Sequence, residues 1–141
     1  KKNYAKVAQD VADKDKGIVL LGDAKIKGIE TVMQLAQDLP SEKFYIFCRT
    51  TDKAIIENNI TYMPWVSNVE NAYKHAKIVV APSICQEAFG RVAAEALTLG
   101  IPCLVNDIGG LPEAVNYDES LIARGYQDFK IKLVKTIKNV K

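Results

Sequence analysis

The sequence predicts an α/β fold, a doubly wound parallel sheet with helices on both faces, from three observations. Short, wholly apolar runs alternate along the chain with segments of helical period. The apolar runs are continuous, as in central strands that are covered on both faces. Glycine and proline residues mark the ends of most segments. Strands that alternate with helices in this order typically form a parallel sheet.

The first half of the chain is predicted to alternate helix and strand. Apolar residues recur at helical spacing from Tyr4 to Val11, and Pro40 ends the second helical pattern. Pro64 closes the third strand. The expected elements are helices over 3–14, 29–39 and 52–57 and strands over 18–21, 43–48 and 60–63.

The second half continues the alternation. Asn68 is expected to cap a helix, and Gly90 to open an Ala-rich helix that stops at Gly100 in a left-handed conformation. The expected elements are helices over 68–76, 90–99, 111–115 and 126–140 and strands over 78–81 and 101–105. Ligands of doubly wound sheets bind beyond the carboxyl ends of the strands. The loops at 22–28, 83–90 and 106–110 all lie at that edge in this prediction.

Length and composition favour one cytoplasmic domain. The chain has 141 residues with 48% hydrophobic content, which is enough for one well-buried domain and little for two. Its net charge of +2 is spread along the sequence, so nothing indicates nucleic acid as a partner. The longest apolar runs fall far below the roughly 20 residues that span a bilayer. Cys48, Cys85 and Cys103 form no CxxC group and are expected to be reduced and mostly buried.

The segment 82–95 carries the main candidate site. Glu87 and Glu95 lie on either side of Gly90, where the loop is expected to turn into a helix. The backbone N–H groups of Gly90, Arg91 and Val92 would lie at the helix start, where they and the helix dipole favour an anion. A phosphate flanked by two acids that bind hydroxyls is typical of a sugar-nucleotide site. By itself the motif is weak, because a helix that starts at glycine and carries an early glutamate is common.

The residues around this motif make it specific. Together they resemble the retaining glycosyltransferases of family 4 (group 1), in the C-terminal nucleotide-sugar-binding domain of their GT-B fold, which is Rossmann-like. The matching positions are Pro82, Ser83, Glu87, Phe89, Gly90, Glu95, Ala96, Gly100, Pro102, Gly109, Gly110 and Glu113.

The resemblance implies a role for each residue of the motif. Glu87 would be catalytic, contacting the hydroxyls of the donor sugar near the reaction centre. Phe89, Gly90 and Arg91 would present backbone N–H groups to the sugar and the distal phosphate, where fixed dipoles stabilise developing negative charge. Glu95 would bind the ribose diol, since one carboxylate accepts two hydroxyl hydrogen bonds.

Lys27, the glycine turn and the loop after the third predicted strand also match the family, outside the segment 82–95. Lys27, before Gly28, would contact the diphosphate, although it is also one of many lysines that water solvates. The turn at Gly109 and Gly110 would lie beside the donor site, and paired glycines also mark ordinary tight turns.

The loop of Pro64, Trp65 and Val66 lies where the family holds the nucleotide base. For Trp65, packing or an interdomain surface is an equally good interpretation.

One departure from the family is plain. The family usually has arginine directly after the glycine that ends the first strand, and this chain has Asp23 after Gly22. An acid beside a diphosphate is unfavourable unless it points away. Lys25 and Arg49 are the candidates to replace the missing phosphate contact.

The remaining features have ordinary interpretations. His75, the only histidine, is expected at the surface or near a helix end, not as a catalyst. No second histidine or acid cluster accompanies it, so no metal site is expected. The basic, amphipathic segment 126–140 resembles a membrane-surface helix, but packing on the sheet explains its spacing better.

The sequence therefore predicts the donor-binding domain of a retaining glycosyltransferase that transfers a hexosyl group from a nucleoside diphosphate sugar. We expect no cofactor and no metal. The chain begins at Lys1 with no room for the family's N-terminal acceptor domain, so we expect a piece of a longer, cytoplasmic polypeptide. The resemblance implies a lipid-linked or glycan acceptor, and a lipid-linked acceptor would place the whole protein at the inner face of the membrane.

Three other hypotheses remain. The first is a catalytically inactive relative that binds a nucleotide or a partner, which Asp23 favours. The second is a domain of a GT-B sugar-nucleotide epimerase. The third, a dinucleotide-dependent oxidoreductase, ranks below both because the loop after the first strand has no G-x-G-x-x-G.

Overall fold

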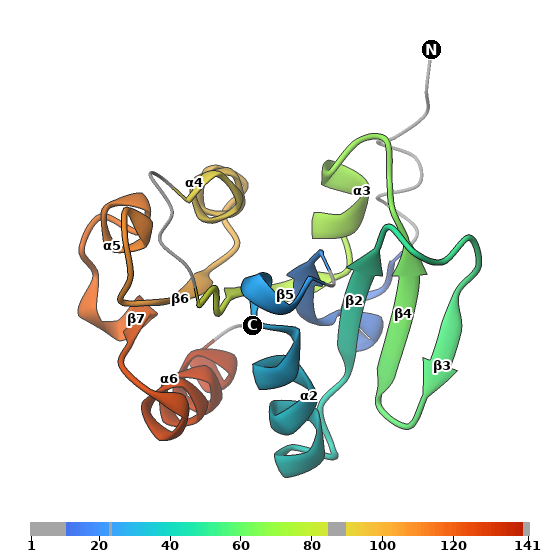
Figure 1. The fold of residues 1–141 in the computed structure, drawn as a ribbon, viewed down its shortest axis with the longest axis horizontal. Helices are drawn as coiled ribbons and strands as arrows, with labels where there is room; N and C mark the ends of the chain where they lie inside the picture. The colour runs from blue at the N-terminus through green and yellow to red at the C-terminus, as the bar shows by residue number, and fades with distance from the viewer. Residues whose placement is uncertain (1–10, 23, 85–89, 140–141) are drawn as a thin grey trace.

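The computed structural model describes residues 11–22, 24–84 and 90–139, and within them it forms one seven-stranded sheet (Figure 1). The strands are β1 (Gly17–Leu21), β2 (Phe44–Cys48), β3 (Ile55–Glu57), β4 (Ile60–Pro64), β5 (Ala76–Ala81), β6 (Cys103–Asn106) and β7 (Ile122–Ala123). Their spatial order is β3-β4-β2-β1-β5-β6-β7, and every neighbouring pair is parallel except β3 and β4. The predicted α/β, doubly wound parallel sheet is confirmed, with one antiparallel strand at its edge.

Helices cover both faces of this sheet. They are α2 (Ile29–Asp38), α3 (Glu70–Tyr73), α4 (Arg91–Thr98), α5 (Leu111–Ala114) and α6 (Tyr126–Asn139). Short 3-10 turns add η1 (Asp13–Asp15), η2 (Lys25–Lys27) and η3 (Glu119–Leu121). In Figure 1, α3, α4 and α5 lie above the sheet and α2 and α6 below it.

The two faces bury separate hydrophobic clusters, because successive side chains of a strand point to opposite sides. Val19 and Leu21 of β1 pack with residues of α3, α4 and α5. Ile18 and Leu20 pack with residues of α2 and α6. All five β1 residues are buried, as expected for a central strand that helices cover on both sides.

The prediction of a helix over 52–57 is wrong. Residues Ile55–Glu57 form strand β3, which pairs antiparallel with β4 through a two-residue turn at Asn58 and Asn59. Asn58 has a left-handed backbone with φ of 57°, a conformation that asparagine tolerates and that suits a tight hairpin turn. Two adjacent isoleucines also favour a strand over a helix.

Three other boundaries differ from the prediction. The helix expected over 68–76 is the shorter α3, because Ala76 already pairs with Gly17 in the sheet. The helix expected over 3–14 falls mostly outside the described residues, and within them Ala12 is extended. The two-residue strand β7 was not predicted, since so short a run carries no period. The other expected elements agree to within two residues.

The chain changes direction across the sheet between β1 and β5. From β1 it builds outward through β2, β4 and β3, and it then returns to add β5, β6 and β7 on the other side of β1. The loops that follow β1 and β5 therefore flank the topological switch point. Ligands of doubly wound sheets bind at this point, beyond the carboxyl ends of the strands.

Candidate functional site

The loops at the switch point are held against one another by backbone contacts. Gly28, after η2, has a left-handed φ of 93°, and a Cβ atom there would lie 2.2 Å from the carbonyl oxygen of Pro82. The N–H of Ile84 donates to the carbonyl oxygen of Ile26 at 3.0 Å. These contacts tie the loop after β1 to the loop after β5. The position of Gly28 admits only glycine, both by conformation and by space.

A third loop joins them through side chains. The Nδ2 group of Asn106, at the end of β6, donates to the carbonyl oxygen of Ser83 at 3.1 Å. Ser83 is itself buried. The expected gathering of the loops after the first, fourth and fifth predicted strands at one edge is thus confirmed.

Gly90 begins helix α4, as predicted, and packs against the loop after β6. A Cβ atom on Gly90 would lie 2.6 Å from Cδ2 of Leu111, the first residue of α5. The predicted glycine pair, Gly109 and Gly110, directly precedes Leu111, and Gly109 has a left-handed φ of 54°. The structure therefore brings this turn beside the start of α4.

Lys27 and Gly90 line the same small hollow at this edge. The Gly90 hollow has a volume of about 30 Å³ and is bounded by Leu20, Leu21, Lys27, Val80, Ala81, Ser83, Gly90 and Val92. That volume suits a single water molecule, not a nucleotide. A ligand at this edge would therefore lie over the hollow and not inside it. Lys27 is half-buried here, so its position differs from that of a lysine fully in solvent.

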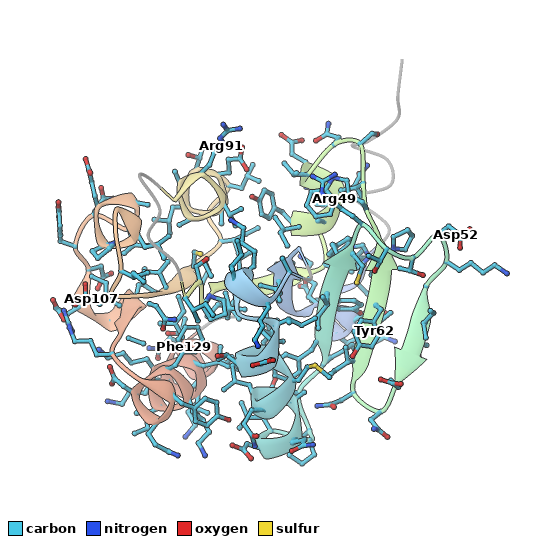
Figure 2. All side chains as sticks on the ribbon, in the orientation of Figure 1. Arg49, Asp52, Tyr62, Arg91, Asp107 and Phe129 are labelled. Carbon is cyan, nitrogen blue, oxygen red and sulfur yellow. The ribbon has the colours of Figure 1, made fainter. Side chains whose placement is uncertain are left out.

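Glu95 lies on the other side of α4, in a larger hollow. The Glu95 hollow has a volume of about 310 Å³ and is lined by Asn68, Val69, Glu70, Tyr73, Arg91, Ala94, Glu95, Thr98 and Leu99. Its volume lies at the lower end of the range of small-molecule sites. Both Arg91 and Glu95 of the predicted motif reach it. Figure 2 shows Arg91 on the outer side of α4, facing away from the sheet.

One oxygen of the Glu95 carboxylate is held by a tyrosine. The hydroxyl of Tyr73 lies 2.8 Å from Oε1 of Glu95 and 3.4 Å from the carbonyl oxygen of Val92. Burial, followed by the hydrogen bond to Glu95, raises the pKa of Tyr73 well above its ordinary value. The hydroxyl therefore stays protonated, and it donates to the carboxylate across the whole physiological pH range.

The predicted base-binding loop lies beside the Glu95 hollow in the chain. Pro64 ends β4, and Trp65 and Val66 pack in part against the hydrophobic cluster on the α4 face. The guanidinium carbon of Arg49 lies 4.0 Å from the centre of the Trp65 ring, at cation–π distance. Packing therefore accounts for part of the role of Trp65, and its exposed face is covered by Arg49.

Three residues that matter to the prediction lie outside the described residues: two predicted site residues and the aspartate that stands where the family usually has arginine. They are Glu87, Phe89 and Asp23. Lys25, one candidate to replace the missing arginine, pairs with Glu30 at 3.8 Å. Arg49, the other candidate, stacks on Trp65.

His75 lies just after α3, so the expected place near a helix end is confirmed, but the expected place at the surface needs correction. The ring is half-buried, with its centroid 5.0 Å from that of Tyr45 and 5.6 Å from that of Phe47. Its Nδ1 atom lies 3.1 Å from the carbonyl oxygen of Asn71. Burial lowers the pKa of His75 below its ordinary value of 6.5. The sequence missed this because the aromatic partners come from another strand, β2.

The described part of the chain contains neither a candidate metal centre nor a helix that could span a membrane. Across residues 11–22, 24–84 and 90–139, no group of three His, Cys, Asp or Glu side chains is placed to hold a metal ion. In the same residues, no helix has the length and apolar character needed to cross a bilayer. Cys48 and Cys103 are buried and form no disulfide within the described residues, as predicted, and Cys85 lies outside those residues.

Sequence reasoning missed Tyr73 and Asn106 as residues of this edge. Tyr73 was assigned only to a helix, and its contact with Glu95 spans 22 positions. Asn106 was placed only in the loop after the last predicted strand, although it holds Ser83 from 23 positions away. One signal was available in the sequence. Polar side chains at the ends of parallel strands or helices are candidates to contact one another, because such ends meet at one edge of the sheet.

Residues 5–139 match the family model described as glycosyl transferases group 1. A D-inositol 3-phosphate glycosyltransferase of Mycolicibacterium smegmatis is 39% identical over 69 residues, which are 48% of this chain and 16% of the relative. The enzyme of the same name from Mycobacterium tuberculosis is 33% identical over 103 residues, covering 70% of this chain and 21% of the relative. This chain thus matches about a fifth of the length of these curated relatives.

Solved structures share the fold. Sucrose-phosphate synthase from Thermosynechococcus elongatus superposes with a TM-score of 0.77 at 21% identity, over 96% of this chain and 40% of that one. HepE of Anabaena, solved with UDP-glucose, gives 0.72 at 15% identity, over 96% and 43%. The C-terminal domain of a glycosyl transferase group 1 protein from Francisella tularensis gives 0.70 at 20% identity, over 98% and 84%.

Proposed function

The chain belongs to the glycosyl transferases group 1 family, and from this premise we propose that it is the donor-binding domain of a retaining glycosyltransferase. The donor would be a nucleoside diphosphate sugar, and the group transferred a hexosyl unit. The family match favours a transferase over the epimerase and oxidoreductase hypotheses. HepE, a protein of the same fold, was solved with UDP-glucose, which supports this donor class.

The observation that carries the proposal is the gathering of the motif residues around the start of α4. Lys27 and Gly90 line one hollow, and Arg91 and Glu95 line the next, on the other side of the first helical turn. The first-turn N–H groups of a helix have no acceptor within the helix and favour an anion. A diphosphate over this turn would lie between a cation and a half-buried carboxylate.

Each residue then has a chemical task. Glu95 accepts hydrogen bonds from the ribose hydroxyls, and charge-assisted bonds of this kind are the stronger ones. Lys27 and the first turn of α4, with Phe89, Gly90 and Arg91, stabilise the diphosphate as it leaves with negative charge. Glu87 contacts the hydroxyls of the sugar. This arrangement needs no metal and no cofactor in the domain.

The base would lie against the loop of Pro64, Trp65 and Val66. This loop leads directly into Asn68 and Val69, which line the Glu95 hollow. The turn of Gly109 and Gly110 would border the sugar, because it packs through Leu111 on Gly90.

The chain spans 16% to 21% of its curated relatives, so the acceptor site of the whole enzyme would come from another part of a longer polypeptide. We propose an N-terminal domain of similar fold as that part. A lipid-linked or glycan acceptor and a place at the cytoplasmic face of the membrane complete the proposal. Without the second domain, the chain should bind donor with little turnover.

Nucleotide titration tests the proposal. We expect this chain to bind one of UDP, GDP and ADP, and the matching nucleotide sugar, in isothermal titration calorimetry. Glu95→Ala should weaken binding of the nucleoside diphosphate by about tenfold or more, since a hydrogen bond to a charged group contributes roughly 1.5–3 kcal/mol. Binding of none of the three nucleotides would contradict the donor-binding function and favour an inactive relative that binds a partner.

Lys27 is tested against an exposed lysine as its control. Lys27→Ala should weaken nucleoside diphosphate by about tenfold and leave the nucleoside unchanged, because only the diphosphate carries the charge that Lys27 would meet. Lys14→Ala is the matched control, since Lys14 is exposed, pairs with Asp15 at 3.9 Å and precedes β1, at the edge opposite the proposed site. Equal losses for diphosphate and nucleoside, or equal effects of the two variants, would remove the phosphate role.

A further inference from the structure

Tyr73 is a buried tyrosine whose hydroxyl bonds to Glu95, the residue proposed to bind the ribose. Its side chain is 1% exposed, yet its hydroxyl reaches the edge of the Glu95 hollow. The hydroxyl donates to Oε1 of Glu95 at 2.8 Å, within the ideal range for O–H···O bonds, and is farther, 3.4 Å, from the carbonyl oxygen of Val92. The carboxylate is therefore the main partner of this hydroxyl.

We propose that Tyr73 is a positioning residue that fixes the Glu95 carboxylate so that its remaining lone pairs face the ribose hydroxyls. The inference rests on the proposed function, because it assigns Tyr73 a task at the same ribose site. We assign Tyr73 no contact of its own with the nucleotide. It acts only through Glu95.

The physical basis is the conformational freedom of glutamate. A free glutamate side chain loses rotamer entropy when it binds a ligand, and this loss subtracts from affinity. Tyr73 lies in a packed core with Ala72 and the α4 residues Ala93 and Ala96, so its own position is fixed. A hydrogen bond from a fixed donor places Oε1 before any ligand arrives. The rotamer entropy of Glu95 is then lost when the chain folds and not when the ligand binds.

Two features of the pair fit this task. A carboxylate offers about four lone-pair positions, so one bond from Tyr73 leaves capacity for both ribose hydroxyls. Tyrosine also donates without adding a charge beside Glu95. A lysine in the same place would form an ion pair with the carboxylate, and its three N–H donors would compete with the ribose hydroxyls for the carboxylate oxygens.

Ribose discrimination is the readout that separates positioning from packing. The probes are UDP, GDP and ADP, and then the 2′,3′-dideoxy form of whichever binds most tightly. In the unchanged chain, the ribonucleotide should bind more tightly than its dideoxy form, because only the ribonucleotide meets Glu95. Tyr73→Phe should reduce this ratio by about 3- to 10-fold, as expected when the Glu95 side chain must be ordered on binding and is no longer held beforehand. The affinity for the dideoxy form should stay unchanged.

Tyr45→Phe is the matched control. Tyr45 belongs to the same hydrophobic cluster, and its hydroxyl also makes one hydrogen bond, to the backbone oxygen of Asp15. This variant should keep the full ribose discrimination. If both Phe variants lower binding of ribo and dideoxy forms alike, Tyr73 serves only to pack the core, and the inference is overturned.

A double-mutant comparison links the effect to Glu95. In the Glu95→Gln background, Tyr73→Phe should produce no further loss of ribose discrimination, because the two changes act on one interaction. Additive losses would contradict positioning through Glu95. If Glu95→Gln abolishes ribose discrimination and Tyr73→Phe alone leaves that discrimination unchanged, the inference about Tyr73 fails while the ribose site at Glu95 stands. If no nucleotide binds the unchanged chain, the proposed function itself fails.

Discussion

The loops at the two ends of the parallel strands are held together in different ways. The carboxyl edge is where the parallel strands end, and the amino edge is where they begin. At the carboxyl edge, the loops after β1 and β5 contact each other through backbone atoms, with Gly28 against Pro82 and Ile84 bonded to Ile26. At the amino edge, one side chain contacts three backbone carbonyl groups. The Nδ2 group of Asn59 lies 2.9–3.1 Å from the carbonyl oxygens of Ala36, Leu39 and Glu42.

The hollows at the two edges also differ in volume, and the candidate site is not in the largest of them. The amino edge has hollows of about 640 and 650 Å³, both larger than the Glu95 hollow of about 310 Å³. Turn and helix-end residues line the larger ones. The Glu95 hollow brings together residues of the sequence motif and a carboxylate held by a buried hydroxyl. The chemistry of the lining residues identifies the candidate site, and volume does not.

The largest expected effect breaks the backbone contact at the carboxyl edge. Gly28→Ala should lower the free energy of unfolding by about 3 kcal/mol or more, because it adds a clash with Pro82 to a left-handed conformation. Gly100→Ala is the matched control, with φ of 80° and no atom within 4 Å of the added Cβ. It should lose only about 1 kcal/mol, the cost of the conformation.

Urea denaturation of the two variants measures the difference. A loss in Gly28→Ala no greater than that in Gly100→Ala would mean that the two loops at the switch point are not in firm contact.

An intermediate effect is expected at the amino edge. Asn59→Ala should lower the free energy of unfolding by about 2 kcal/mol, because three carbonyl groups lose their shared donor. Nucleotide affinity should stay unchanged, since Asn59 lies at the edge opposite the proposed site. Gln34→Ala is the control: its amide makes one exposed bond to Asp38, and the change should stay within about 0.5 kcal/mol.

The same urea experiment, followed by nucleotide titration, tests this contrast. A marked fall in nucleotide affinity in Asn59→Ala would show that the two edges are coupled.

The smallest effect concerns pH at the amino edge. His75 has a folded-state pKa lowered by burial below its ordinary value of 6.5. The unfolded chain therefore binds the proton more readily, and stability that is complete above about pH 6.5 is lost as pH falls toward the folded-state pKa. His75→Gln should show a flatter dependence of unfolding free energy between pH 7.5 and 5.5.

This window lies above the range in which the carboxylates titrate, so their contribution is small there. An unchanged slope in His75→Gln would mean that the ring is not desolvated by Tyr45 and Phe47.

The sequence predicted most of the sheet because central strands are continuous apolar runs. The run at 18–21 needed no partner to be recognised, and Gly90 and Gly100 mark the two ends of α4 by conformational rules that act locally. The errors occurred where length was short or the partner distant. Ile55–Glu57 is only three residues long, and pairing with β4 decided its structure.

The candidate site divides in the same way. The spacing of Gly90, Arg91 and Glu95 was readable because it lies within one loop and one helix. That Lys27 shares a hollow with Gly90 follows from the strand order, which places β1 beside β5. Neither the Tyr73 bond to Glu95 nor the Arg49 contact with Trp65 is visible in the sequence, because each joins residues 16 or more positions apart.

The sequence by itself therefore determined the fold class and the family, and it named the residues of the candidate site. Local rules set these, since hydrophobic period, glycine conformation and motif spacing act over a few residues. Only the tertiary structure decided which side chains hold the motif in place. Contacts such as Tyr73 with Glu95 and Gly28 with Pro82 form only once the sheet has brought distant segments together, and the packing of that sheet selects them.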